Sequence, residues 1–226
     1  MAIGLVQEIS DTGTSSGGTV IYTATFNAAS QAGNLLIALI CFNGSATPDI
    51  PTGFTLATSN TNADGSKIYL YYQADAPSTT TISTKVIATV GAANSCIIFI
   101  AEWQGVQQSS PLDQTGSGSS ASGTVPTGSV TTTSAYELLI AGVSDLAGDT
   151  FSSPTNGFIL LDQDNVGSGA TLQAGGFLYN VVTSTGTYSS SVTNSSTTGG
   201  NGVIASFISI PGTVPAYNSI FFAAIS

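Results

Sequence analysis

The chain carries one strand-like pattern twice, and this internal repeat limits its fold more than any other feature. The segment Asn34-Leu-Leu-Ile-Ala38 returns as Glu137-Leu-Leu-Ile-Ala141, and Ile100-Ala-Glu-Trp103 returns as Ile204-Ala-Ser-Phe207. A repeat of this kind indicates units that pack on one another to bury a shared apolar surface. We therefore expect two related halves, at residues 1–107 and 108–210.

Other matches keep the same order along the chain, at an offset of 103 to 105 residues. They are Gly18-Thr-Val20 with Gly123-Thr-Val125 and Pro51-Thr-Gly-Phe54 with Pro154-Thr-Asn-Gly-Phe158. Tyrosine-bearing segments that begin at Ile68 and Phe177 follow in both halves. Trp103 is matched by Phe207, and an aromatic residue at both positions indicates a core site.

Alternation of side chains predicts strands in both halves. Val20, Tyr22, Ala24 and Phe26 fall on one face, and the same period of two runs through residues 82–90 and 97–103. This period is typical of half-buried strands, whereas no segment combines a helical period with caps. Residues 35–41 are apolar throughout, which favours a strand buried on both faces. We expect an all-β, two-layer antiparallel sandwich, jelly-roll-like, with about four to five strands from each half.

The two halves are expected to form a single domain, residues 1–210, because neither could cover its apolar face alone. Two independent domains remain the alternative. Residues 109–122 have the composition of a linker, but the repeat assigns them to the edge strand and loop that open the second half. Residues 211–226 fall outside the repeat and form an apolar C-terminal extension.

Ionisable side chains are scarce and almost all acidic. Lys67 and Lys85 are the two cations, Arg and His are absent, and twelve Asp and Glu residues give a net charge of −10. Binding to nucleic acid requires Lys or Arg against phosphate, and anionic membranes attract basic segments. The composition therefore excludes nucleic-acid and membrane partners, and 32 Ser and 31 Thr residues are available to face water instead.

The same scarcity argues against catalysis. Without His there is no Ser-His or Cys-His pair, and without Arg there is no guanidinium clamp for a phosphate. We therefore expect that the protein is not an enzyme and binds no cofactor. Two carboxylate pairs remain, Asp145 with Asp149 and Asp162 with Asp164, both in segments rich in turn residues. We expect hydrogen bonds within turns for both pairs. Calcium binding, best at Asp162 and Asp164, and glycoside hydrolysis are the alternatives.

Two further pairs of residues have a structural and a chemical interpretation. Glu102 and Glu137 lie in predicted strands, and we expect them to face outward; the alternative is that a buried carboxylate of this kind promotes an isopeptide bond between Lys67 or Lys85 and an asparagine. Cys41 and Cys96 lie in apolar runs. Two buried thiols are expected rather than a disulfide, because residues 1–10 lack the features of a secretory signal.

Candidate partner contacts lie in two places. The C-terminal extension holds an apolar run, with Ile220, Phe221, Phe222 and Ile225 as candidates, which must be covered by its own subunit or lent to a neighbour. Tyr69 and Tyr71 are the second candidates. Tyr72 follows Tyr71 directly, and adjacent strand residues point to opposite faces, so one set of tyrosines is expected outside the core.

The repeated segments together resemble a Ser/Thr/Gly-rich β-sandwich found in virion proteins of tailed phages and in some secreted bacterial proteins. The resemblance rests on the motifs around Asn34, Pro51 and Ile68 and on Ile100-Ala-Glu-Trp-Gln-Gly-Val106. It implies a non-enzymatic structural virion protein of the capsid cement or decoration type. Such a protein is made in the host cytoplasm and binds the major capsid protein and copies of itself, as a homotrimer. A glycan-binding or adhesion module of a phage tail or cell surface is the alternative.

Overall fold

The computed structural model describes residues 2–88, 91–196 and 198–212, and regular structure within them is almost entirely β-strand. A short 3-10 turn at Gly169–Thr171 is the helical element of this part of the chain. No helix in these ranges is long and apolar enough to cross a bilayer. The predicted all-β, antiparallel sandwich built from two repeated halves is confirmed.

Each half contributes more strands than the sequence pattern predicted. The first half contains β1 (Gly4–Ser15), β2 (Gly18–Thr25), β3 (Leu35–Asn43), β4 (Thr55–Thr61), β5 (Lys67–Gln73), β6 (Thr81–Ala88) and β7 (Asn94–Gln104). The second half contains β8 (Leu112–Ser120), β9 (Thr124–Thr131), β10 (Glu137–Asp145), β11 (Phe151–Ser152), β12 (Ile159–Val166), β13 (Gln173–Val182), β14 (Thr187–Asn194) and β15 (Gly200–Ile208). Strands such as β4 and β8 consist mostly of small polar residues, so no apolar alternation reveals them.

The topology repeats strand by strand. In the first half a five-stranded sheet has the order β1-β7-β3-β5-β4, and in the second half the order is β8-β15-β10-β13-β12. The remaining strands pair as β2-β6 and as β9-β14, with β11 added to β14. Because β8 takes the place of β1 at the sheet edge, residues 109–122 belong to the body of the second half, as the repeat predicted.

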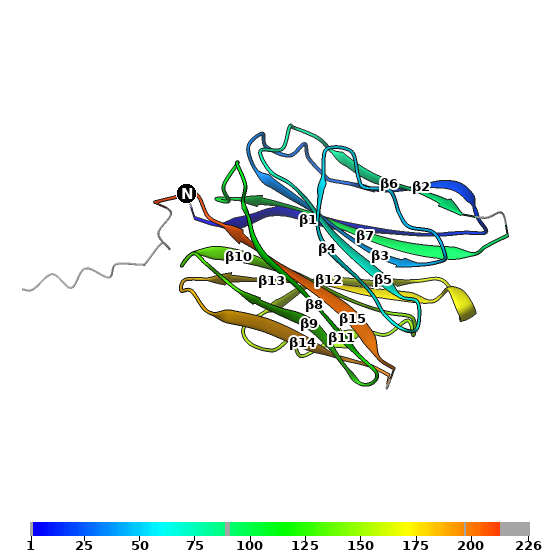
Figure 1. Cartoon of the computed structure of the whole chain (residues 1–226). Coiled ribbons are helices and arrows are strands. Elements are labelled where there is room, and N and C mark those ends of the chain that lie inside the picture. The colour runs from blue at the N-terminus through cyan, green and yellow to red at the C-terminus, as the bar shows by residue number, and fades with distance from the viewer. Residues whose placement is uncertain (1, 89–90, 197, 213–226) are drawn as a thin grey trace, which may run out of the picture.

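The sheets form four layers rather than two (Figure 1). The two five-stranded sheets pack face to face in the middle, the β2-β6 ribbon covers the outer side of one, and the β9-β14-β11 sheet covers the outer side of the other. Each half is thus a sandwich of its own, and the halves stack back to back. The extra layers follow from β3 and β10, whose residues are buried on both faces and need cover on both sides.

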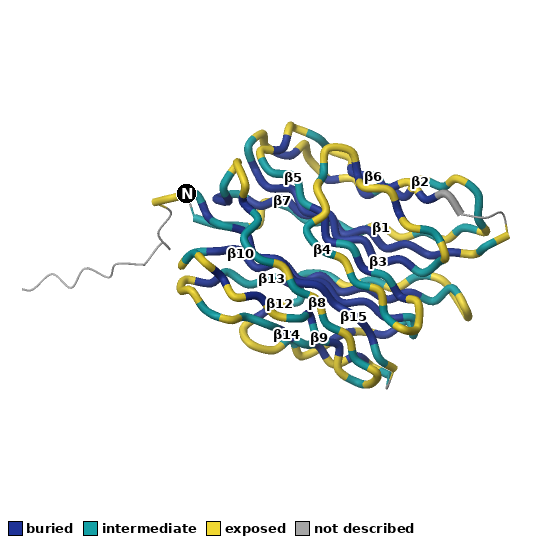
Figure 2. The backbone as a smooth tube through the Cα atoms, viewed as in Figure 1, coloured by how far each residue is buried: buried dark blue, intermediate teal, exposed yellow. Residues whose placement is uncertain are grey.

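Alternation along β3 distributes its side chains between two cores. Leu35, Ile37 and Leu39 face the second half and belong to the central core, whereas Leu36 and Ile40 face the β2-β6 ribbon. Figure 2 shows the buried segments running through the two middle layers. The prediction of a strand buried on both faces is confirmed for residues 35–41.

The central core brings the two halves into close contact. Trp103 and Phe207 are both buried there, so the prediction of a shared aromatic core position is confirmed. A Cβ added at Gly142 would lie 2.5 Å from a methyl carbon of Leu39. At one edge of this core, Asn60 donates to the Gly118 carbonyl at 2.8 Å and Asn201 donates to the Asn60 carbonyl at 3.1 Å. These bonds join β4 of one half to β8 and β15 of the other.

Both cysteines are buried free thiols, as predicted. Cys41 faces the central core, and Cys96 belongs to the core between β2-β6 and its sheet. Because the two side chains lie in different cores, on opposite faces of one sheet, the fold separates them. Burial raises the pKa of both thiols above the usual range.

Candidate binding surfaces and buried carboxylates

The outer face of the β2-β6 ribbon carries the most exposed large apolar side chains of the described residues. Ile21 on β2 is 64% exposed, and Ile50, in the loop before β4, is 54% exposed. Both line a shallow hollow of about 280 Å³, together with Lys85. The Lys85 ammonium pairs with the Asp49 carboxylate at 3.2 Å. This Ile21–Ile50 face therefore combines exposed apolar area with a surface ion pair.

The second half does not repeat this apolar surface. At the offset of the matched Gly-Thr-Val segments, Ile21 corresponds to Pro126, and at the offset of the proline motifs, Ile50 corresponds to Ser153. Ser153 is exposed and Pro126 is partly buried. The Ile21–Ile50 face is thus a property of the first half alone, not a consequence of the repeated fold.

The candidate tyrosines lie largely within the structure. Tyr71 is only 2% exposed and belongs to the core beneath the β2-β6 ribbon, where it stacks on the half-buried Tyr69 at 6.1 Å between ring centroids. Tyr72 points to the opposite face and meets Phe207 edge-on at 5.5 Å. The tyrosines do point to both faces, but the four-layer arrangement covers both. Tyr71 is therefore a core residue rather than a surface contact.

The other predicted contacts, Ile220, Phe221, Phe222 and Ile225, lie outside the described residues. The described chain reaches Gly212 close to the N-terminal strand. The Ile210 amide donates to the Gly105 carbonyl at 3.0 Å, and a Cβ on Gly105 would touch the backbone of Ala2. The start and the end of the described chain therefore meet at one end of the molecule.

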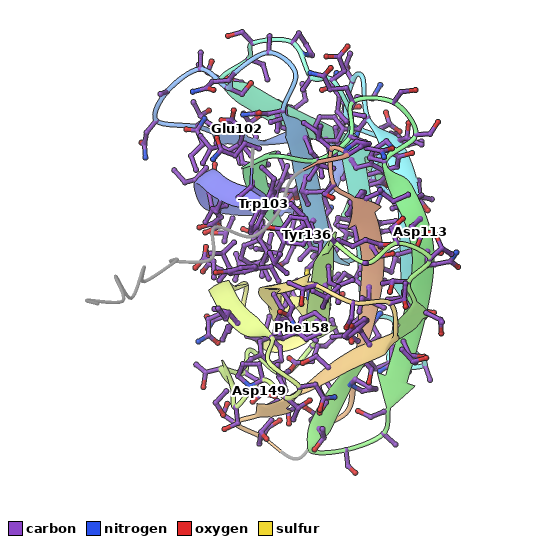
Figure 3. All side chains as sticks on the ribbon, turned by 90° about the vertical axis from the view of Figure 1, so that its left-hand side faces the viewer. Glu102, Trp103, Asp113, Tyr136, Asp149 and Phe158 are labelled. Carbon is purple, nitrogen blue, oxygen red and sulfur yellow. The ribbon has the colours of Figure 1, made fainter. Side chains whose placement is uncertain are left out.

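Glu102 is buried, so the expectation that it faces outward is wrong (Figure 3). Its carboxylate accepts from the Gln7 amide at 2.7 Å, from the Asn34 amide at 2.6 Å and from the Gln31 backbone at 2.7 Å. Glu102 lies on β7 in the same alternation as Ile98 and Ile100, which also face inward. A buried carboxylate with three donors ties β1, β7 and the loop before β3 together.

Glu137 is also buried, and the expectation that it faces outward is wrong for this residue too. One carboxylate oxygen accepts from the Ser134 backbone at 2.9 Å, while the other has no hydrogen-bond partner among the described residues. Burial raises the pKa of Glu137 and the neighbouring Asp113 carboxyl adds to the rise, whereas the bond from Ser134 opposes it. Glu137 is therefore held less completely than Glu102.

Both lysines bind groups that cannot take part in an isopeptide bond of the kind considered above. Lys67 donates to the carbonyls of Gly44 at 2.6 Å and Ala46 at 2.8 Å, whereas Lys85 pairs with Asp49. The carboxylates of Glu102 and Glu137 are bound by amide donors instead. Within the described ranges, neither lysine amine is paired with the Glu102 or Glu137 carboxylate that would promote a Lys–Asn bond.

Asp162 and Asp164 lie on strand β12, so the turn that the sequence suggested for them is wrong. Their strand runs beside β1 where the two halves meet, and Ser10 donates to the Asp164 carboxylate at 3.4 Å. Burial, with the nearby Asp162 carboxylate, raises the pKa of Glu8 to about 8. Glu8 and Asp162 thus form a carboxyl pair across the boundary between the halves.

Asp145 and Asp149 flank the bend that follows β10, and both are buried (Figure 3 labels Asp149). The predicted hydrogen bond within this segment is confirmed for Asp145 alone, because Asp149 is bound by Ser195 and Ser196. Asp145 ends β10 and accepts from the Ala147 backbone at 2.9 Å. Asp149 accepts from the hydroxyls of Ser195 at 2.7 Å and Ser196 at 2.5 Å. Burial raises the pKa of Asp145 to about 7. Although burial acts against it, these hydroxyls lower the pKa of Asp149.

Two ionisable residues with defined roles were not singled out from the sequence, namely Glu8 and Asp113. Asp113 accepts from both the amide and the hydroxyl of Thr133 at 2.7 Å. Although burial acts to raise it, these bonds hold the pKa of Asp113 below its usual value. The packing of β1 against β12 would have pointed to Glu8, but that packing depends on how the halves stack.

The described residues contain no group of three or more His, Cys, Asp or Glu side chains that could hold a metal ion. Their carboxyl pairs, Glu8 with Asp162, Asp113 with Glu137 and Asp145 with Asp149, can share a proton, since like charges in contact disfavour double ionisation. Comparisons with protein families, with curated protein sequences and with solved structures gave no match. The residues described above are therefore the basis for assigning a function.

Proposed function

We propose that this chain is a non-enzymatic structural protein that attaches to a larger protein shell through its Ile21–Ile50 face, as a cement or decoration protein of a tailed phage does. The observation that carries the proposal is the exposure of Ile21 and Ile50 on one outer face of a protein rich in Ser and Thr. Exposed apolar residues that gather at one place mark interaction sites more often than single ones do.

The size of this face favours a repeated partner over a single one. Burying one isoleucine side chain stabilises a complex by about 1.5–3 kcal/mol, so two isoleucines alone give a weak contact. Several copies joined in one oligomer multiply such contacts without any new interaction, provided the partner presents its sites in an array. A shell of identical subunits is an array of this kind, and a homotrimer of this chain would match it.

Rigidity and charge are compatible with that role. The three cores form a continuous stack from the β2-β6 ribbon to the β9-β14-β11 sheet. A body of paired strands transmits load without a hinge. The net charge of −10 suits a part on the outside of a shell, away from a packaged nucleic acid.

The glycan-binding alternative is less well supported by the geometry. It relied on exposed tyrosines or on a loop at Asp162. Tyr71 is buried, and Asp162 lies on a strand beside β1. Glycan binding therefore enters as an outcome of the test rather than as a second proposal.

The test compares the wild-type protein with the double variant Ile21→Ser and Ile50→Ser for co-sedimentation with purified phage shells. The variant Ile159→Ser is the matched control, because Ile159 is also about half exposed but lies on β12. We expect the double variant to lose attachment and the control to keep it. Equal binding by all three proteins would overturn the role of this face, and binding to a glycan array without attachment to any shell would favour the alternative.

A further inference from the structure

The buried pair Asp145 and Asp149 differs from the other carboxylates in what surrounds it. Asp149 is 5% exposed and Asp145 is fully buried. The two cations of the chain are bound in the first half, Lys67 to loop carbonyls and Lys85 to Asp49. The side chains around the pair therefore supply hydroxyl and amide donors but no positive charge.

Two oxygen atoms at this place lack a hydrogen-bond partner among the described residues. One is an Asp145 carboxylate oxygen and the other is the Asn194 amide oxygen, and both are buried. Asn194 is 5% exposed and pairs with Phe151 on β11, two residues after Asp149. Buried acceptors without donors are costly. Such a pair of oxygen atoms indicates a ligand that accepts electron pairs.

In the first half, a lysine side chain binds the loop that is equivalent to the β10–β11 loop. The offset of 103 residues holds from Asn34 to Pro51, so Phe42 corresponds to Asp145 and Ala46 to Asp149. In that loop the Lys67 ammonium binds the carbonyls of Gly44 and Ala46. The first half thus places a cation of its own against this loop.

The second half has no cation at the equivalent position. Lys67 pairs with Phe42 across the sheet, and Ala174 pairs with Asp145 in the same register. Ala174 therefore stands where the first half has Lys67. The loop gains two carboxylates at the positions of Phe42 and Ala46, so the change replaces a built-in positive charge with two negative ones.

We propose that Asp145, Asp149 and Asn194 form a calcium-binding site between the β10–β11 loop and the end of β14. Calcium takes six to eight oxygen ligands in flexible geometry, and it accepts carboxylates, amide oxygens, backbone carbonyls and water. Magnesium requires a stricter octahedron and gives up its water reluctantly, so an irregular loop favours calcium. With two carboxylates the site is weak, at about 10⁻⁴–10⁻³ M, the range of extracellular modules.

A shared proton is the competing explanation for the same geometry. A proton on Asp145 could be donated to Asn194 or to Asp149, which would satisfy the buried oxygen atoms without a metal. The two explanations differ in their response to calcium at neutral pH. They also differ in the effect of Asp145→Asn, because an asparagine there supplies the donor that the proton would have supplied.

The experiment uses the full chain, stripped with a chelator and titrated with CaCl₂ or MgCl₂ by calorimetry and by thermal unfolding. We expect heat of binding and a rise in Tm with ~10 mM calcium, tenfold above the weak end of the range, and a smaller rise with magnesium. Asp145→Asn and Asp149→Asn should both abolish the calcium response, whereas Asp162→Asn should retain it. The Asp162 variant is the matched control because its carboxyl belongs to the other pair.

Three outcomes would overturn the site. The first is the absence of both heat and a Tm change in the wild-type protein at that calcium concentration. The second is a calcium response that survives in both variants. The third is an Asp145→Asn protein that is more stable than the wild type at pH 7 with or without calcium, which would identify the shared proton instead. The wild-type titration decides the question even where a variant fails to fold.

Discussion

Glu102 and Glu137 occupy equivalent places in the two halves, beside the loop that precedes β3 in one half and β10 in the other. The two residues nevertheless lie on strands that are not equivalent. Glu102 on β7 accepts from the Gln31 backbone, and Glu137 on β10 accepts from the Ser134 backbone. Gln31 and Ser134 are matched at the offset of 103 residues. The same loop amide is therefore bound by a carboxylate in each half, reached from β7 in one and from β10 in the other.

In each half, the residue matched to the other half's glutamate is polar and neutral. Where the first half has Glu102 the second has Ser206, and where the second half has Glu137 the first has Asn34. At these two matched positions each half thus has one carboxylate and one neutral polar residue. The second half differs in that the Asp113 carboxyl also lies beside Glu137 and helps to raise the pKa of Glu137.

Replacing Glu102 with Gln should destabilise the protein by about 2–3 kcal/mol. Hydrogen bonds to a charged group contribute about 1.5–3 kcal/mol each to stability, and the new amide would face the donors of Gln7 and Asn34. Chemical denaturation measures the change. Glu137→Gln is the control and should cost less, because the raised pKa of Glu137 already favours a neutral side chain at that place. A larger loss for Glu137→Gln would contradict this account.

The Glu8 carboxyl should make stability fall as pH rises. Its pKa is raised from 4.5 to about 8 in the folded protein, so the folded state holds the proton more tightly than the unfolded state does. The free energy of unfolding then declines from about pH 4.5 and levels off above about pH 8. Glu8→Gln should flatten this part of the profile and stabilise the protein above pH 8.

Solvent screening limits the size of the effect for a partly exposed group, so about 1 kcal/mol is expected. Asp145 acts in the same direction, since its pKa is also raised. The difference between wild type and Glu8→Gln isolates the contribution of Glu8. An unchanged pH profile in the variant would remove the carboxyl pair with Asp162 from the explanation.

Gly142→Val should destabilise the protein by about 1–3 kcal/mol through overpacking of the central core. The added Cβ would meet Leu39 at 2.5 Å and Ile68 at 2.9 Å. Thermal unfolding measures the loss, and the second substitution Leu39→Ala in the same chain should recover part of it. A Gly142→Val protein as stable as the wild type would mean that the two halves separate readily at this point.

Cys41 and Cys96 should resist thiol reagents in the folded protein. Both are buried, and burial raises the pKa of both thiols, so little thiolate is present. Labelling should become fast only in denaturant, when both thiols react together. Rapid labelling of one thiol under native conditions would show that its core opens locally.

Much of the fold could be predicted from the sequence because alternation and repetition are local or pairwise properties. Residues 35–41 are apolar without interruption, which indicates a strand covered on both sides. What covers each side is not a local property, so the third and fourth layers could not be predicted. Tyr71 was assigned to a surface for this reason, although the β2-β6 ribbon covers it.

The buried carboxylates were harder to predict than the strands. Glu102 falls in the same alternation as Ile98 and Ile100, and this signal could have placed it inside. Glu102 was nevertheless expected to face outward, because charged residues are seldom buried without partners. Its partners Gln7 and Gln31 are distant in sequence and could not be foreseen. Asp162 was assigned to a turn because its neighbours Gln163, Asp164 and Asn165 are turn residues, yet β13 pairs with all of them.

The meeting of the described chain's two ends at Gly105 has a consequence for the order of the halves. Ala2 and Ile210 both lie against Gly105, which is also near the junction between the first and second halves. A circularly permuted chain that begins at residue 108 and joins Gly212 to Ala2 by a short linker would therefore keep every strand pairing of the described residues. None of these strand pairings then requires the first sandwich to precede the second along the chain.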